Sequence, residues 1–154
     1  MKVLFVCLGN ICRSPAAEGV FLHQLEQAGL SKKYTVDSAG TSAHHAGEWA
    51  DQRMRSHAEA RGIELKSISR QFIESDFDNF DLIVVMDDQN YKNCASLAHN
   101  DEHLSKLVRM TDFTPSFSEK EVPDPYYGGA AGFDHVLDMV EEGCANLIKK
   151  CEQA

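Results

Sequence analysis

The N-terminal segment reads as a strand, a short loop and a helix, and this order constrains the fold more than any other feature. Residues 2–6 (KVLFV) form a short apolar run that is typical of a strand buried on both faces. Ser14 is the predicted N-cap of the helix, Pro15 lies in its first turn, and Gly29 ends it. Apolar residues recur in between at helical spacing, at Ala17, Phe21, Leu25 and Ala28. Such a segment is half of a β-α-β unit and favours a parallel sheet.

The alternation of strands and helices continues along the chain. Further strands are predicted at residues 34–39, 80–86 and, more weakly, 104–110, and further helices at 51–61, 88–98 and 133–148. Right-handed crossovers leave few arrangements for such a series. We predict an α/β fold in which a doubly wound, four-stranded parallel sheet of order 2-1-3-4 carries helices on both faces. At 154 residues, the whole chain (1–154) is expected to form one domain.

Charge and hydrophobicity argue against several classes of protein. The formal net charge is −9 and the sequence pI is about 5.1, whereas nucleic-acid-binding surfaces need clustered Lys and Arg. The apolar runs are shorter than the roughly 18 to 20 residues of a membrane span. Five cysteines at irregular spacing are typical of free thiols in a reducing compartment. We therefore expect a cytoplasmic protein that binds neither nucleic acid nor membrane.

The loop between the first strand and the first helix, residues 7–14 (CLGNICRS), carries the strongest chemical signal. In doubly wound folds, ligands bind at the carboxyl ends of the strands, where the winding changes direction. Consecutive N–H groups in such a loop, with a helix N-terminus behind them, can form a cradle for an oxyanion. Gly9 and Asn10 are expected to supply the backbone positions with φ > 0. Arg13 could bind two phosphate oxygens at once, so an acidic protein could build a local site for a dianion.

Cys7 would lie at the bottom of this cradle, where the amides, the helix dipole and Arg13 all favour the thiolate. A thiolate beneath a bound phosphorus atom is suited to in-line attack and to a covalent phosphoenzyme. Ser14 could hydrogen-bond either the sulfur or the helix N-terminus. The alternative is a buried cysteine in an ordinary strand-to-helix turn, and the combination with Gly9 and Asn10 argues against it.

Asp124 is the candidate general acid. It lies between Pro123 and Pro125, which favour an extended backbone that could hold its carboxyl group rigidly over a pocket. The group could protonate the departing oxygen and later accept a proton from the attacking water. A stiff surface turn is the other interpretation of Pro-Asp-Pro.

Tyr126 and Tyr127 could flank a phenyl ring. A deep slot between them would let phosphotyrosine reach Cys7 while the shorter phosphoserine falls short. Ordinary packing at the base of a loop is the alternative for one of the two tyrosines.

At this point the sequence becomes recognisable, because VLFVCLGNICRSPAAE resembles the active-site segment of the low-molecular-weight protein tyrosine phosphatases. Four later segments resemble segments of that family in the same order and at similar spacing: VDSAGTS, SRQ (69–71), DFDNFDLIVVMDDQN and VPDPYYGG. The resemblance extends over the whole chain, and the ordered set is more specific than any one motif.

The resemblance implies Cys7 as nucleophile, Arg13 as phosphate-binding side chain and Asp124 as general acid. The other positions that it assigns are the phosphate-binding loop of Leu8, Gly9, Asn10, Ile11 and Cys12; a polar network of Asn10, Ser14 and Ser38; Asp87 as partner of Arg13; and slot walls from Leu8, His44, Tyr126 and Tyr127. From the residues alone, Asp87 is equally well a helix cap.

Two positions limit what the resemblance implies. His44 stands where the family usually varies and often has an aromatic residue, so substrate preference does not carry over. Ser67 replaces a histidine that often supports the loop asparagine, which leaves the outer support of Asn10 open.

Three other functions fit parts of the pattern. A protein arginine phosphatase has a similar loop, but its bacterial relatives tend to have threonine where this chain has Ile11. A thiol-coupled arsenate reductase would need two further redox cysteines after the third strand, where only Cys94 lies. A phosphate-binding module without turnover would use Arg13 but not both Cys7 and Asp124.

Phosphotyrosine-containing proteins or peptides are the expected partners, and the chain is expected to be a monomer or a weak dimer. No cofactor is expected, and the spacing of His and Cys does not match a metal site. The resemblance also implies that Cys12 pairs with Cys7 under oxidation, and the alternative is that Cys12 only packs beneath the loop.

Overall fold

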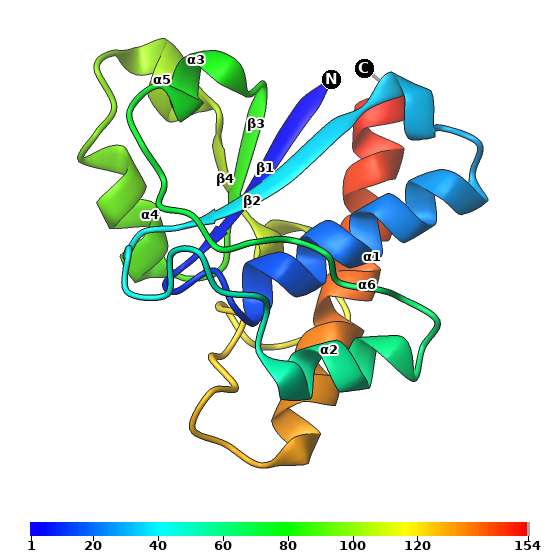
Figure 1. The fold of residues 1–154 in the computed structure, drawn as a ribbon. Coiled ribbons are helices and arrows are strands. Elements are labelled where there is room, and N and C mark those ends of the chain that lie inside the picture. Colours follow the sequence, from blue (N-terminus) through cyan, green and yellow to red (C-terminus); the bar gives the residue numbers. More distant parts are fainter. Residues whose placement is uncertain (154) are drawn as a thin grey trace.

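A four-stranded parallel sheet forms the centre of the molecule (Figure 1). The computed structural model describes residues 1–153. The strands are β1 (Lys2–Cys7), β2 (Thr35–Gly40), β3 (Leu82–Val85) and β4 (Leu107–Arg109). Their order is β2-β1-β3-β4, and all three pairings are parallel. The predicted order 2-1-3-4 is therefore confirmed.

Helices cover both faces of this sheet, as predicted. They are α1 (Arg13–Gln27), α2 (Gln52–Glu59), α3 (Asp76–Asn79), α4 (Asp88–Ala95), α5 (Asp101–Ser105) and α6 (Ala130–Gln153), with single 3-10 turns at Ser31–Lys33 and Met110–Phe113. Helices α1, α2 and α6 pack on one face, and α3 and α4 pack on the other (Figure 1). Within residues 1–153, no helix is both long enough and apolar enough to cross a membrane.

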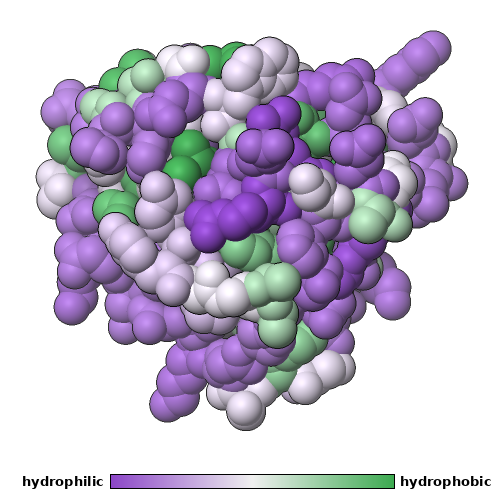
Figure 2. Space-filling model, turned by 60° about the horizontal axis from the view of Figure 1, so that its bottom comes forward, coloured by the Kyte–Doolittle hydropathy of each residue, from purple (hydrophilic) through white to green (hydrophobic). Residues whose placement is uncertain are grey.

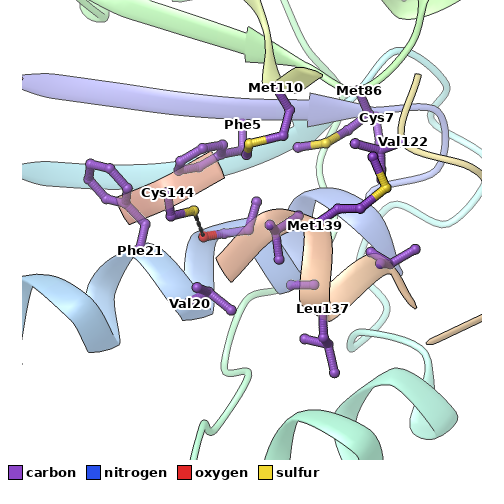
Figure 3. Packing of buried hydrophobic residues seen from close by; sticks show 14 of the residues in the cluster. Phe5, Cys7, Val20, Phe21, Met86, Met110, Val122, Leu137, Met139 and Cys144 are labelled. Atoms are coloured by element: carbon purple, nitrogen blue, oxygen red, sulfur yellow. Dashed lines mark hydrogen bonds between the residues drawn. The ribbon is translucent and has the colours of Figure 1, made fainter. Parts of the chain in front are cut away.

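Strand β1 is buried from both sides, which explains its unbroken apolar sequence. Val3, Phe5 and Cys7 belong to the core cluster under α1 and α6, whereas Leu4 and Val6 belong to the cluster on the other face. Figure 3 follows the first cluster from Phe21 and Phe5 to Cys7, which lies at its far end beside Met86 and Val122. The core thus fixes the end of β1, where the loop with the candidate nucleophile begins.

Two predictions about element boundaries were wrong. Ser14 is not the N-cap of α1, because the helix begins at Arg13 and Cys12 occupies the cap position without a side-chain cap bond. The weak strand predicted at 104–110 is limited to Leu107–Arg109, because Leu104 belongs to α5. Asn100 caps that helix by accepting a hydrogen bond from the His103 backbone N–H at 2.8 Å, a local signal that outweighs the apolar pattern.

The central position of Phe5 generates a stability prediction. Phe5 is fully buried and its ring meets that of Phe21 edge-on, with centroids 5.4 Å apart. Phe5→Ala should lower the free energy of unfolding by about 3–5 kcal/mol, because it leaves a cavity beneath the sheet. Leu22→Ala is the control, since Leu22 is 42% exposed on α1 and its loss should cost roughly 0.5 kcal/mol or less. Urea unfolding of both variants measures the difference, and equal losses would contradict this account of the core.

Candidate active site

The loop from Leu8 to Cys12 leaves the sheet at the carboxyl end of β1 and leads directly into α1 (Figure 1). Asn10 has φ = 56° and is the only non-glycine residue with positive φ among residues 1–153. The expectation that Gly9 also has positive φ was wrong. What Gly9 supplies is space, because a Cβ atom there would lie 3.0 Å from Cδ2 of His45.

Gly40 is a requirement of this loop that the sequence analysis missed. It ends β2 and pairs with Cys7 across the sheet. A Cβ atom at Gly40 would lie only 2.7 Å from the Leu8 carbonyl oxygen. Any residue larger than glycine at this position would therefore clash with the loop where it passes β2. The next residues hold the loop there, since the N–H groups of Thr41 and Ser42 donate to the carbonyls of Cys7 and Leu8, both at 2.9 Å.

The side chain of Asn10 holds the strained loop in place. Its Nδ2 donates to Ser14 Oγ at 2.8 Å and to Ser38 Oγ at 3.0 Å, and its Oδ1 accepts from the Arg70 N–H at 3.0 Å. Asn10 is 1% exposed, and both polar atoms of its buried side chain have hydrogen-bond partners, as buried polar groups require. The network predicted from Asn10, Ser14 and Ser38 is thus brought together in space.

Ser14 contacts the sulfur and does not cap the helix. Its Oγ lies 3.1 Å from Cys7 Sγ and 3.3 Å from the Ala39 carbonyl oxygen. Because Asn10 already donates to this hydroxyl oxygen, the Ser14 proton can go to the sulfur or to the Ala39 carbonyl oxygen. When it points at the sulfur, the hydrogen bond favours negative charge there.

A second layer of support comes from residues 69–70, which sequence reasoning matched only as part of a motif. The Ser69 hydroxyl donates to the Asn10 carbonyl oxygen. The Arg70 guanidinium binds Asp76 with both terminal nitrogens at 3.1 Å and Asp37 through Nε at 3.0 Å. These contacts fix the segment that supports Asn10, which answers the question left open by Ser67. Ser67 itself lines a separate cavity on the far side of α1.

Arg13 is held by two elements distant in sequence. Its Nη1 donates to Asp87 Oδ2 at 2.7 Å and to the Val122 carbonyl oxygen at 3.1 Å. Burial alone lowers the pKa of Arg13, but the charges of Cys7 and Asp87 outweigh it and raise the pKa above its usual range. Asp87 also accepts from the Asn90 N–H at 2.7 Å, so it is both the N-cap of α4 and the partner of Arg13. The structure thus places Asp87 in both of the positions considered for it.

Asp124 stands beside Arg13 and remains accessible. Its Oδ2 lies 3.7 Å from Arg13 Nη2, and its Oδ1 accepts from the Tyr126 N–H at 3.1 Å. The Asp124 side chain is 41% exposed, compared with 4% for Arg13. A carboxylate in this position can exchange protons with a molecule in the cavity while its backbone stays fixed.

These residues surround one cavity of about 330 Å³. It is lined by Cys7, Leu8, Gly9, Ile11, Cys12, Arg13, Ser42, His44, His45, Asp124, Tyr126 and Tyr127. The ring of Tyr126 packs edge-on against that of Tyr127, with centroids 4.9 Å apart, and Tyr127 is 94% exposed. Tyr126 is therefore a fixed wall, and Tyr127 is free to meet a ligand at the rim. His45 is a lining residue that the sequence analysis did not predict.

The backbone amides of the loop are available to a ligand. Within residues 1–153, the N–H groups from Leu8 to Arg13 donate to no backbone or side-chain acceptor. They lie at the start of α1, where the helix dipole favours an anion. The molecular surface on the lower side of Figure 1 is mostly hydrophilic, with apolar residues only in small patches (Figure 2).

Cys12 and Cys94 are harder to ionise than a free thiol. Burial and the charge of Asp51 raise the pKa of Cys12 well above that of a free thiol. Cys94 is fully buried in the core on the other face of the sheet, and burial raises its pKa to about 12. Among residues 1–153, no cluster of three or more His, Cys, Asp and Glu side chains could hold a metal ion.

Comparison with known proteins assigns the chain to a family. Residues 2–154 match the family described as low molecular weight phosphotyrosine protein phosphatase. A crystal structure of a protein tyrosine phosphatase from Entamoeba histolytica superimposes with a TM-score of 0.96 at 48% identity, covering 99% of this chain and 97% of that one.

Curated relatives give the same result. A low molecular weight protein-tyrosine-phosphatase of Streptomyces coelicolor is 40% identical over 96% of this chain and 91% of its own. A low molecular weight phosphotyrosine protein phosphatase of Schizosaccharomyces pombe is 39% identical over 97% of this chain and 96% of its own. With its sheet order, its loop and its sequence in agreement, the chain belongs to the low molecular weight protein tyrosine phosphatase family.

Proposed function

We propose that the chain removes phosphate from protein tyrosine through a phosphocysteine intermediate at Cys7. The observation that carries the proposal is that Cys7, Arg13 and Asp124 line one cavity at the start of a helix. Membership of the phosphatase family supports the same chemistry. In this proposal, residues 1–154 form a single phosphatase domain that works without a metal or cofactor.

The loop amides and Arg13 bind the phosphate. The free N–H groups from Leu8 through Gly9, Asn10, Ile11 and Cys12 to Arg13 surround the dianion, and the guanidinium donates two parallel hydrogen bonds to it. Asp87 and the Val122 carbonyl orient the guanidinium before substrate arrives, which lowers the entropy lost on binding. The buried positive charge of Arg13, together with the free loop amides, explains how a chain of net charge −9 can hold an anion.

In the first step, the Cys7 thiolate attacks phosphorus and forms an S–P bond while the P–O bond to the tyrosine breaks. Asp124 gives its proton to the departing phenolate oxygen, so tyrosine leaves as the neutral phenol. In the second step, water attacks the phosphocysteine and transfers a proton to Asp124. The S–P bond breaks, inorganic phosphate leaves, and the Cys7 thiolate is regenerated beside the Ser14 hydroxyl.

The depth of the cavity selects the substrate. Leu8, His44, Tyr126 and Tyr127 form its walls, and the nucleophile lies at its floor with only 2% of its surface exposed. A phenyl ring spans this depth, whereas the side chain of phosphoserine is too short to place its phosphorus at the sulfur.

The same reasoning extends to partners and location. The substrates are phosphotyrosine-containing proteins or peptides, and the acidic surface argues against binding to nucleic acid or to anionic membranes. We further propose that the enzyme is cytoplasmic and a monomer or weak dimer, with free thiols kept reduced.

We also propose that Cys12 protects Cys7 during oxidation. Both cysteines belong to the loop that closes around the phosphate site, and the charge of Cys7 acts on Cys12. Peroxide would oxidise the Cys7 thiolate to a sulfenic acid, and attack by the Cys12 sulfur would release water and form a disulfide. Two-electron reduction by a dithiol would restore both thiols.

The substrate assignment is tested by comparing phosphotyrosine, phosphoserine and phosphoarginine peptides, with arsenate reduction measured alongside. Phosphotyrosine should be hydrolysed fastest, and Cys7→Ser should lower its turnover by about 10⁴-fold or more while vanadate binding persists. Fastest turnover of phosphoarginine, or thiol-dependent arsenate reduction, would replace the tyrosine assignment. Near wild-type activity in Cys7→Ser would contradict the mechanism.

The role of Asp124 is tested by a leaving-group series. Asp124→Asn removes the transferable proton but keeps the size of the side chain, and it should slow hydrolysis of tyrosine phosphate by roughly 10²–10⁴-fold. Activated aryl phosphates should lose less, because their phenolates leave without protonation. The slope of log kcat against leaving-group pKa measures the effect. An equal loss across the series would assign the acid to another group.

The redox proposal is tested by inactivation with peroxide followed by recovery with dithiothreitol. Wild type should regain most of its activity, whereas Cys12→Ser should regain much less, because an unprotected sulfenate proceeds to irreversible acids. Cys94→Ser is a matched control, since Cys94 lies in the core on the other face of the sheet. Equal recovery of wild type and Cys12→Ser would make Cys12 a bystander.

A further inference from the structure

Glu18 is a carboxylate that neither the mechanism nor the resemblance uses. It lies on α1 one turn beyond Ser14, and its Oε1 accepts a hydrogen bond from Ser38 Oγ at 2.5 Å. Its side chain is partly buried at the edge of a cavity of about 400 Å³ that runs along the side of α1. This cavity is separate from the one that holds Cys7.

Glu18 stands at one end of a hydrogen-bonded chain whose other end is the nucleophile. Ser38 donates to Glu18 and accepts from Asn10 Nδ2 at 3.0 Å. The second Nδ2 proton of Asn10 goes to Ser14 Oγ at 2.8 Å, and Ser14 Oγ lies 3.1 Å from Cys7 Sγ. The order is therefore Glu18, Ser38, Asn10, Ser14, Cys7.

The direction of each bond in this chain follows from counting protons. A serine hydroxyl has one proton and an ionised carboxylate has none, so the Ser38 proton must point at Glu18. The Ser38 oxygen is then free to accept from the Asn10 amide. Because Asn10 donates to Ser14 in turn, the single Ser14 proton is left for one of two acceptors, the Cys7 sulfur at 3.1 Å or the Ala39 carbonyl oxygen at 3.3 Å.

We propose that Glu18 is a positioning residue that, by accepting from Ser38, fixes the direction of the chain so that Ser14 donates to the Cys7 sulfur. This inference rests on the proposed function of Cys7. Without an acceptor at position 18, the Ser38 proton is free to turn toward Asn10 and compete with its amide protons. The Arg70 N–H still holds the Asn10 oxygen, but the amide is less firmly held at Ser38. The Ser14 hydroxyl that this amide binds can then turn its proton from the sulfur to the Ala39 carbonyl oxygen.

The surroundings of Glu18 favour this acceptor role over an ion pair. Burial raises the pKa of Glu18 to about 7, and the charge of Asp37 adds to this rise. The Ser38 hydrogen bond and the charge of Arg70 act in the opposite direction. The other charged or titratable groups lining its cavity are His23 and Glu26 from α1 and Glu64 and Lys66 from the segment after α2. Among the described residues, the hydrogen-bond partner of Glu18 is Ser38, and none of these ionic groups is paired with it.

The raised pKa also sets the sign of the stability effect. A carboxyl group with a higher pKa in the folded state than in the unfolded chain destabilises the fold as pH rises from about 4.5 to 7, and this cost persists above that range. Removing Glu18 should therefore not lower the melting temperature at pH 8. A loss of Cys7 reactivity at unchanged melting temperature would separate positioning from general loosening of the fold.

The experiment compares Glu18→Gln, Glu18→Leu and wild type at pH 8, above the raised pKa of Glu18, by the rate of Cys7 alkylation with iodoacetamide followed by mass spectrometry. Glu18→Gln keeps an acceptor oxygen and should alkylate within about twofold of wild type. Glu18→Leu should alkylate about tenfold more slowly, as expected for loss of one hydrogen bond to a charged group. Because alkylation needs no substrate, this result is independent of whether phosphotyrosine is hydrolysed.

Two further variants make the test specific. Glu26→Leu changes a carboxylate on the same helix and cavity that has no contact with the chain, and it should alkylate at the wild-type rate. If Glu18 acts through Ser38, then Ser38→Ala combined with Glu18→Leu should be no slower than Ser38→Ala alone. The proposal would be overturned if Glu18→Leu alkylated at the wild-type rate, if Glu18→Gln were as slow as Glu18→Leu, or if the double variant showed the product of both losses.

Discussion

The side-chain hydrogen bonds of Asn10 are the interaction on which the site depends. A non-glycine residue at φ = 56° is costly on its own, and it persists where surrounding contacts over-determine it. Here Asn10 is tied to α1 through Ser14, to β2 through Ser38 and to the Arg70 backbone. The loop between β1 and α1 is therefore tied to three parts of the fold, and its N–H groups are left free for a ligand. Preorganised donors of this kind stabilise the charge of a transferring phosphoryl group without later rearrangement.

The same network supports the two functions of the loop, which are to bind an anion and to hold the Cys7 thiolate. The anion and the thiolate are both negatively charged, and the chain as a whole is acidic. The buried positive charge of Arg13 offsets the repulsion between these negative groups. The guanidinium is fixed by Asp87, which follows β3, and by the Val122 carbonyl, which precedes the Asp124 loop. The three segments that must meet for catalysis are thus joined by one guanidinium. Displacing any of them would disturb both the phosphate site and the candidate acid.

Local patterns in the sequence were sufficient for the sheet order and for the position of the loop. Together with the family resemblance they named most of the residues that line the cavity, but not Ser42 or His45. What they could not provide depends on contacts between distant segments. Gly40 is required only because β2 pairs beside the loop, and the support from Arg70 comes from a segment 60 positions away from Asn10. Ser14 was predicted as a helix cap because its own neighbourhood favours one, yet Asn10 and Cys7 engage its hydroxyl instead. Helix α5 is the exception, because the signal that was missed there, the Asn100 cap, is local.

The central claim is that the phosphoryl group passes through the sulfur of Cys7, and rapid mixing with an activated aryl phosphate tests it most directly. The account predicts a burst of phenol close to one equivalent per enzyme when hydrolysis of the intermediate is the slower step. Acid quenching during the burst, followed by peptide mass spectrometry, should then place a phosphoryl group on Cys7. A phosphoryl group on another residue, or labelled water incorporated into phosphate by direct attack with Cys7 never modified, would contradict the account.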